Sequence, residues 1–147
     1  MKINVNKTIS KAASYKRKGE LDEARKLYEA VLHSYPNNIR AQEGLAGLNK
    51  PTQQQLDSLI ALYNKRLWSD VVEEAHLLVT DFPSSFIVWN ILGAAHKAIG
   101  QLERAENAFL RASAVNPNFS DAHNNLGVLL KDQGKLDAAI AAYERAL

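Results

Sequence analysis

Four histidines are the side chains of this sequence best suited to bind a metal ion or to move a proton. They are His33, His76, His96 and His123. Two histidines that hold one metal ion from a single helix stand about four residues apart, and no pair here has that spacing. The chain has no cysteine, which excludes disulfides and thiolate metal sites. We therefore expect no metal and no cofactor, and we expect His96 and His123 to serve packing.

Catalytic motifs are also missing from the sequence. It contains no G-x-S-x-G nucleophile turn, no phosphate-binding loop and no dinucleotide fingerprint. Carboxylates such as Glu103, Glu106, Asp137 and Glu144 are scattered over the outer faces of predicted helices. That distribution is typical of a solvated surface rather than of a general acid and base held in one cleft. The sequence predicts a protein that is not an enzyme.

A run of cations at the N-terminus suggests a different chemistry. Six of them precede the first acid, Glu20, and these are Lys2, Lys7, Lys11, Lys16, Arg17 and Lys18. Such a cluster would suit a nucleic acid or an anionic surface. Aromatic residues that could stack on bases are not interleaved with it, since Tyr15 fits the helix core. A solvated helix is favoured, and no nucleic-acid partner is expected.

Composition agrees with a protein that packs a core and faces water. Hydrophobic residues make up 46% of the 147 residues and charged residues 23%, with a net charge of +2. No apolar run approaches the roughly 18 residues that a membrane span needs, and the first ten residues lack the apolar stretch of a signal peptide. These features predict no membrane partner and a cytoplasmic location.

The elements that carry these side chains repeat along the chain. Between residues 86 and 147, Leu92-Gly93 recurs as Leu126-Gly127, and each matched position advances by 34. The other matched pairs are Gly100 and Gly134, Leu102 and Leu136, Ala105 and Ala139, and Phe109 and Tyr143. This W-L-G…A…F…P skeleton resembles the tetratricopeptide repeat. The resemblance implies an all-α, right-handed superhelical α-solenoid of antiparallel helix pairs, with about nine helices.

The repeats can be placed along the whole chain. Residues 1–51 are predicted to form an N-terminal repeat, with helices at 5–18 and 21–34, followed by an extra short helix at 38–49. Thr52-x-x-Gln55 predicts a capping box that opens a new helix after Pro51. Residues 52–147 would then hold a degenerate repeat two, repeat three at 86–119, and a truncated repeat four. Residues 39–51 are thirteen residues in excess of the 34-residue period, and they predict an offset in the array near Pro51.

The first helices of such an array are expected to line a concave groove. Eleven residues would face into it, and they are Leu56, Ile60, Tyr63, Asn64, Asn90, Ala94, Lys97, Asn124, Asn125, Val128 and Lys131. In some members of the resembled family, an asparagine at the place of Asn125 holds peptide backbone. The clamp that some members use for acidic chaperone tails is not expected, because Leu56, Ile60, Ile91 and Asp121 occupy its places.

These observations lead to two hypotheses about function. The first is a non-catalytic scaffold that binds a protein or peptide segment in the groove. The second is the N-terminal recognition or oligomerisation region of a larger bacterial glycosyl- or sulfotransferase. Asn124-Asn125-Leu126-Gly127 is similar to repeats found beside such catalytic domains. The unfinished repeat four also suggests a fragment of a longer protein.

Self-association is a further expectation, because the last predicted helix has an apolar stripe that no following helix covers. The stripe consists of Leu136, Ala139, Ile140, Tyr143 and Leu147, and contact with another copy would use Leu136, Ile140, Tyr143 and Leu147.

Overall fold

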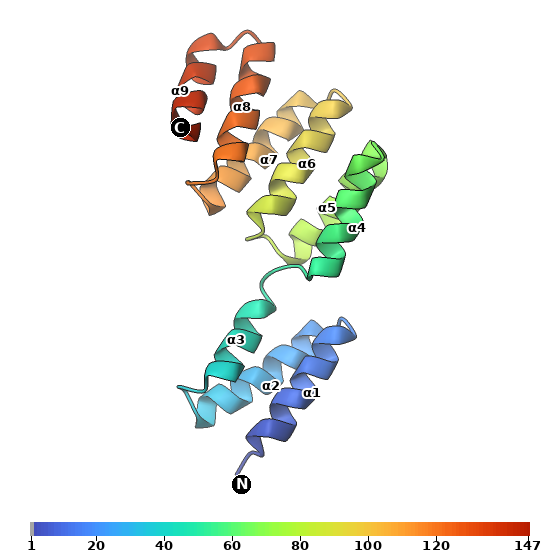
Figure 1. The fold of residues 1–147 in the computed structure, drawn as a ribbon, viewed down its shortest axis with the longest axis vertical. Coiled ribbons are helices and arrows are strands. Elements are labelled where there is room, and N and C mark those ends of the chain that lie inside the picture. The colour runs from blue at the N-terminus through green and yellow to red at the C-terminus, as the bar shows by residue number, and fades with distance from the viewer. Residues whose placement is uncertain (1) are drawn as a thin grey trace. The chain divides into compact units, whose positions relative to one another are not determined.

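The computed structural model describes residues 2–147, and within that range the chain forms nine α-helices and no strand (Figure 1). The helices are α1 (Val5–Arg17), α2 (Leu21–Ser34), α3 (Ile39–Gly47), α4 (Gln53–Asn64), α5 (Trp68–Asp81), α6 (Phe86–Ala98), α7 (Leu102–Val115), α8 (Ser120–Asp132) and α9 (Leu136–Ala146). The all-α fold and the helix count expected from the repeat pattern are confirmed.

The chain divides into two compact units, Met1–Lys50 and Pro51–Leu147. Pro51 precedes α4, whose N-terminus carries the expected capping box. The Thr52 side chain accepts a hydrogen bond from the backbone N–H of Gln55 at 3.2 Å, and the Gln55 side chain accepts one from the backbone N–H of Thr52 at 2.9 Å. These bonds satisfy donors that the first turn of a helix otherwise leaves unpaired, so α4 starts at a defined residue.

The first unit contains α1, α2 and α3 around one core. The buried residues of this core are Ile9, Ala12, Ala24, Tyr28, Val31, Ala41 and Leu48. The short helix α3 packs on α2, as expected for the first helix of a following repeat. Gly44 makes this approach possible, because a Cβ at that position would clash with the Tyr28 ring.

The second unit is built from the hairpins α4–α5, α6–α7 and α8–α9. Each first helix packs on its own second helix, and α6 also contacts both α4 and α8. The first helices α4, α6 and α8 therefore form one layer, with α5 and α7 behind them in Figure 1. Phe109 of α7 lies over Gly93 of α6, and Tyr143 of α9 lies over Gly127 of α8. The two glycines thus let paired helices approach closely, as their spacing predicted.

Three of the four hairpin turns contain a glycine with a positive φ. These are Gly19, Gly100 and Gly134, with φ of 79°, 81° and 77°. Repeat two has Arg66 at the corresponding place, 34 positions before Gly100, with φ of 59°. The hairpin needs a left-handed residue there, and a side chain with a Cβ is strained in that conformation. The left-handed conformation of Arg66 was not predicted from the sequence.

No helix within residues 2–147 is both long enough and apolar enough to cross a membrane.

Candidate functional site

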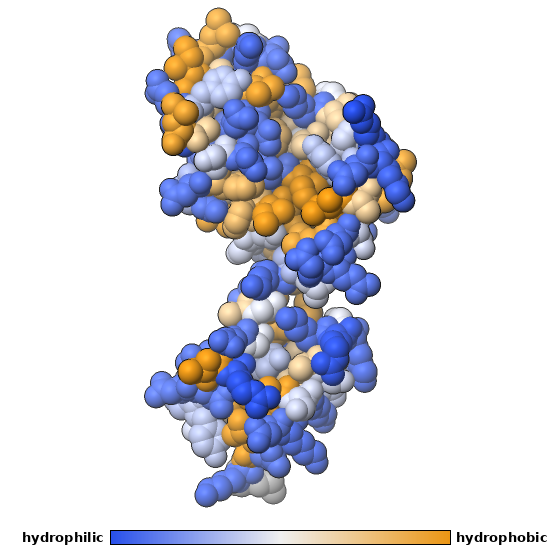
Figure 2. Space-filling view, viewed as in Figure 1, coloured by the Kyte–Doolittle hydropathy of each residue, from blue (hydrophilic) through white to orange (hydrophobic). Residues whose placement is uncertain are grey.

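The helices α4, α6 and α8 form the first-helix face of the second unit, and all eleven residues predicted for the groove lie on these three helices. In Figure 2, hydrophobic side chains gather on this side of the unit over α6 and its neighbours. Ile60 and Ile87 are among the large apolar residues exposed there. The face therefore combines accessible apolar surface with the polar side chains that the sequence predicted.

Two side-chain contacts join α6 to α8 on this face. Asn125 Nδ2 donates a hydrogen bond to Asn90 Oδ1 at 3.0 Å. Two turns further along, Lys97 Nζ lies 3.7 Å from Asp132 Oδ2. Each contact joins residues 35 positions apart, so the two helices lie side by side in repeat register. The pairing of Asn90 with Asn125 was not predicted, although both residues were assigned to the groove.

The Asn90–Asn125 pair leaves polar capacity unused. A carboxamide has two N–H donors and a carbonyl oxygen with two acceptor positions. Asn90 uses its oxygen in the pair and keeps its N–H donors, whereas Asn125 uses one N–H and keeps its oxygen. The half-buried pair can thus offer a donor and an acceptor to one peptide unit. It is held in place by its own hydrogen bond.

The other predicted residues of α6 and α8 differ in their exposure. Ala94 and Val128 are half-buried, and Ala94 packs against the core that repeats three and four share. Asn124 and Lys131 are exposed. Lys97 is engaged by Asp132, so Lys131 is the cation of this face that no carboxylate within residues 2–147 pairs.

The α4 part of the face differs from the expectation in one respect. Leu56 is half-buried, while Ile60 and Asn64 are exposed. The Tyr63 ring packs edge-on against Trp68 of α5, with ring centroids 5.2 Å apart. Tyr63 therefore supports its own hairpin, because the tryptophan that replaces the leucine of later repeats offers it an aromatic partner.

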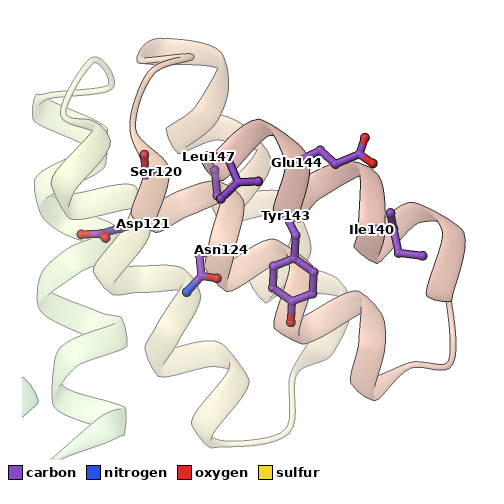
Figure 3. Close-up of a pocket in the computed structure, with 8 residues that line it drawn as sticks. Ser120, Asp121, Asn124, Ile140, Tyr143, Glu144 and Leu147 are labelled. Atoms are coloured by element: carbon purple, nitrogen blue, oxygen red, sulfur yellow. The ribbon is translucent and has the colours of Figure 1, made fainter.

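Asn124 also lines a pocket of about 500 Å³ between α8 and α9. Figure 3 shows Asn124 and Tyr143 directed into this pocket, with Asp121 on α8 and Glu144 on α9 at its edges. Adjacent residues of a helix point about 100° apart, so Asn124 reaches this pocket while Asn125 reaches α6. The two neighbouring asparagines therefore lie at different sites: Asn124 lines the pocket, and Asn125 contacts α6.

The apolar stripe predicted on α9 is divided by the structure. Ala139 is buried, and Tyr143 is half-buried because its ring covers Gly127. Leu136 and Ile140 are 60% and 55% exposed, and Leu147 is also exposed. The exposed apolar surface of α9 is therefore narrower than the sequence predicted, because the Tyr143 ring packs in the core.

The histidines do not form a metal centre, and no group of three or more metal-ligand side chains occurs within residues 2–147. His96 is buried, with Nδ1 2.6 Å from Gln101 Oε1. His123 is also buried, and its Nε2 donates to the carbonyl oxygen of Pro117 at 2.7 Å. Both are packing residues, as the repeat positions predicted.

The bond of His123 repeats one made by Trp89. Trp89 Nε1 donates to the carbonyl oxygen of Pro83 at 2.8 Å. Donors and acceptors are both 34 positions apart, so a ring N–H bonds the first helix to the preceding turn in repeats three and four. The match of His123 with Trp89, and of Pro117 with Pro83, is a signal in the sequence from which this bond could have been predicted.

The match to known proteins follows the same repeats. Tetratricopeptide repeat models match residues 11–38 and 92–147. A TPR repeat-containing protein of Methanocaldococcus jannaschii is 24% identical over 92% of this chain, which spans 23% of that relative's length. A crystal structure of MamA is similar over 92% of this chain and 71% of its own, with a TM-score of 0.60 and 28% identity.

A second solved structure, the Sgt2 TPR domain from Aspergillus fumigatus, covers 67% of this chain and 67% of its own. It has a TM-score of 0.61 and 26% identity. The two matched ranges lie in different units of the chain and together exceed half of its length. Residues 11–38 and 92–147 of this chain are therefore tetratricopeptide repeats.

Proposed function

We propose that the second unit is a non-catalytic scaffold that binds an extended protein or peptide segment along the first-helix face. The observation that carries this proposal is the Asn90–Asn125 pair. It presents a donor and an acceptor beside apolar surface, and it is already fixed before a ligand arrives. A fixed pair costs less side-chain entropy on binding than two free amides.

The charges of this face favour a ligand without a strong net charge. Lys97 is offset by Asp132, and Asp121 is exposed near the start of α8. Of the two cations predicted for the groove, Lys131 has no carboxylate partner within the described residues 2–147. We infer that amide contacts to the peptide backbone and apolar contacts with Ile60 and Val128 supply most of the affinity.

A displayed library of short peptides, selected on the intact chain, tests this proposal. Affinities of the selected peptides are then measured for the wild type and for Asn90→Ala/Asn125→Ala/Lys131→Ala. The triple variant is expected to bind at least about tenfold more weakly, the effect of losing a few backbone hydrogen bonds. The matched control is Lys65→Glu/Arg145→Glu, which changes two exposed cations outside the face. Equal affinities for all three proteins would place the site elsewhere.

The transferase alternative stays a prediction that concerns the surrounding gene. A catalytic domain encoded in the same open reading frame would support it. A reading frame that continues only with further helical repeats would count against it.

We also propose that the chain associates with a second copy through α9. Leu136, Ile140 and Leu147 expose apolar surface on this helix, and Tyr143 borders the pocket that it forms with α8 (Figure 3). Sedimentation over a range of concentrations tests this, with Ile140→Lys as the variant. A rise in mean mass for the wild type that Ile140→Lys abolishes is the expected result, and a wild type that stays monomeric would contradict it.

A further inference from the structure

A second cleft lies on the opposite side of the second unit from the Asn90–Asn125 pair. It has a volume of about 710 Å³ and is bounded by α5 and α7, with residues of α6 at its floor. Val72 and Leu77 come from the α5 wall, and Leu77 is 58% exposed. Trp89 and Leu92 come from the floor. We call this hollow the outer cleft, and the groove proposal does not use it.

The α7 wall of the outer cleft is cationic. Arg104 and Arg111 both line it, both are exposed, and they stand seven positions apart. Seven residues are two helical turns, so the two side chains leave the same face about 10.5 Å apart. The Arg111 guanidinium carbon lies 5.5 Å from the centre of the Trp89 ring. This cation–π contact holds Arg111 at the edge of the cleft.

Neither arginine is engaged by a carboxylate in the part of the chain that the structure covers, residues 2–147. Glu73 stands on the α5 wall, across the cleft. Ala108 lies between the two arginines and is 3% exposed. Because its side chain is small, it leaves a depression at the centre of the α7 wall. The α7 wall therefore combines two free positive charges with a small apolar depression.

The outer face of α9 has the opposite features at the same spacing. Asp137 and Glu144 are exposed and stand seven positions apart. Ile140 lies between them on the same face and is 55% exposed. Two carboxylates and a protruding apolar side chain on α9 thus match two guanidinium groups and an apolar depression on α7.

We propose that α9 of one copy docks in the outer cleft of a second copy, with Asp137 and Glu144 against Arg104 and Arg111. Ile140 then fills the depression over Ala108. This rests on the self-association proposed for α9 and names the surface that receives it. The two surfaces differ, so the contact is heterologous, and a pair of copies keeps one free α9 on one copy and one free outer cleft on the other. Assembly therefore continues beyond a dimer as concentration rises.

Charge exchange tests this pairing in the full chain. Arg104→Glu/Arg111→Glu places like charges opposite α9, and Asp137→Arg/Glu144→Arg does the same from the other side. Each variant alone is expected to associate at least about tenfold more weakly than the wild type, because like charges are brought together. Mixing the two variants, or combining all four changes in one chain, restores opposite charges and should restore association. Lys2→Glu/Lys7→Glu, which reverses two exposed cations of the first unit, is the matched control and should behave as the wild type.

The readout is the weight-average mass by sedimentation equilibrium at low and at high salt. Wild-type association should weaken as salt rises, because exposed charge pairs are screened. Far-ultraviolet circular dichroism confirms that each variant is folded. If the Arg104→Glu/Arg111→Glu variant associates as strongly as the wild type, docking in the outer cleft is refuted, while association through α9 is not. A wild type that remains monomeric would overturn both, and neither result bears on peptide binding at the first-helix face.

Discussion

Replacing Gly93 with alanine should destabilise the second unit, although alanine is the better helix former. A Cβ at this position would lie 2.6 Å from Phe109 Cε1 and 2.7 Å from Phe109 Cδ1. Carbon atoms in contact are normally about 3.5–4.0 Å apart, so the ring would have to move by about 1 Å. Phe109 is only 1% exposed and has little room to move.

Overpacking of this kind costs about 1–3 kcal/mol, and the gain in helix propensity returns about 0.5–1 kcal/mol. A net loss of up to about 2.5 kcal/mol is expected for Gly93→Ala. Both tryptophans, Trp68 and Trp89, belong to the second unit, so tryptophan fluorescence during urea unfolding reports on that unit.

Gly47→Ala is the matched control for this substitution. Its new Cβ would meet only the Lys16 Nζ atom, at 3.1 Å, and that flexible chain end can move aside. This variant should be neutral or slightly more stable when followed by circular dichroism. A Gly93→Ala protein stabilised to the same degree as Gly47→Ala would refute the close packing of Gly93 and Phe109.

The degenerate repeat two supplies a compensating pair. Leu59 stands where Gly93 stands and Ala75 where Phe109 stands, and both are fully buried. The large and small residues have therefore exchanged helices. Phe109→Ala alone should cost about 3–5 kcal/mol. Gly93→Leu/Phe109→Ala should lose at least about 1 kcal/mol less than the sum of the two single changes. If the free-energy losses of the two single substitutions simply add in the double variant, the proposed exchange of large and small residues is contradicted.

Substitutions followed by urea unfolding test three other features of the fold. Arg66→Gly should stabilise the second unit by about 1 kcal/mol by relieving a left-handed residue, and Gly100→Arg should cost a similar amount; the opposite signs would refute the strain at Arg66. His123→Phe should cost about 1 kcal/mol more than His123→Trp, because only tryptophan keeps an N–H for the Pro117 carbonyl; equal losses would deny that bond a role. Ala105→Leu should cost about 1–3 kcal/mol at a fully buried helix seam, and an unchanged midpoint would contradict the packing there.

The repeat skeleton could be predicted because it depends on local rules. The helix predicted at 21–34 forms over those residues, and that predicted at 5–18 forms as Val5–Arg17. Small residues at a fixed spacing and a capping box are sequence features with one structural meaning each. The short helix after repeat one was also predictable, because apolar spacing and Pro51 define it without any distant contact.

Several contacts of the site could not be predicted in the same way. The bond between Asn90 and Asn125 depends on the lateral register of two helices 35 positions apart, which repeat spacing gives only to within a residue. Tyr63 turned to Trp68 because an aromatic replaced a leucine across the hairpin. The outer cleft arises from the small side chain of Ala108 between two arginines, a feature of the surface that helix periodicity does not reveal.

Chemical-shift mapping of the labelled chain with a library-selected peptide tests the central claim most directly. We expect the perturbed amides, including the side-chain amides of Asn90 and Asn125, to lie on α4, α6 and α8. Perturbations confined to α5 and α7, or side-chain amides of Asn90 and Asn125 that do not shift at saturation, would contradict it.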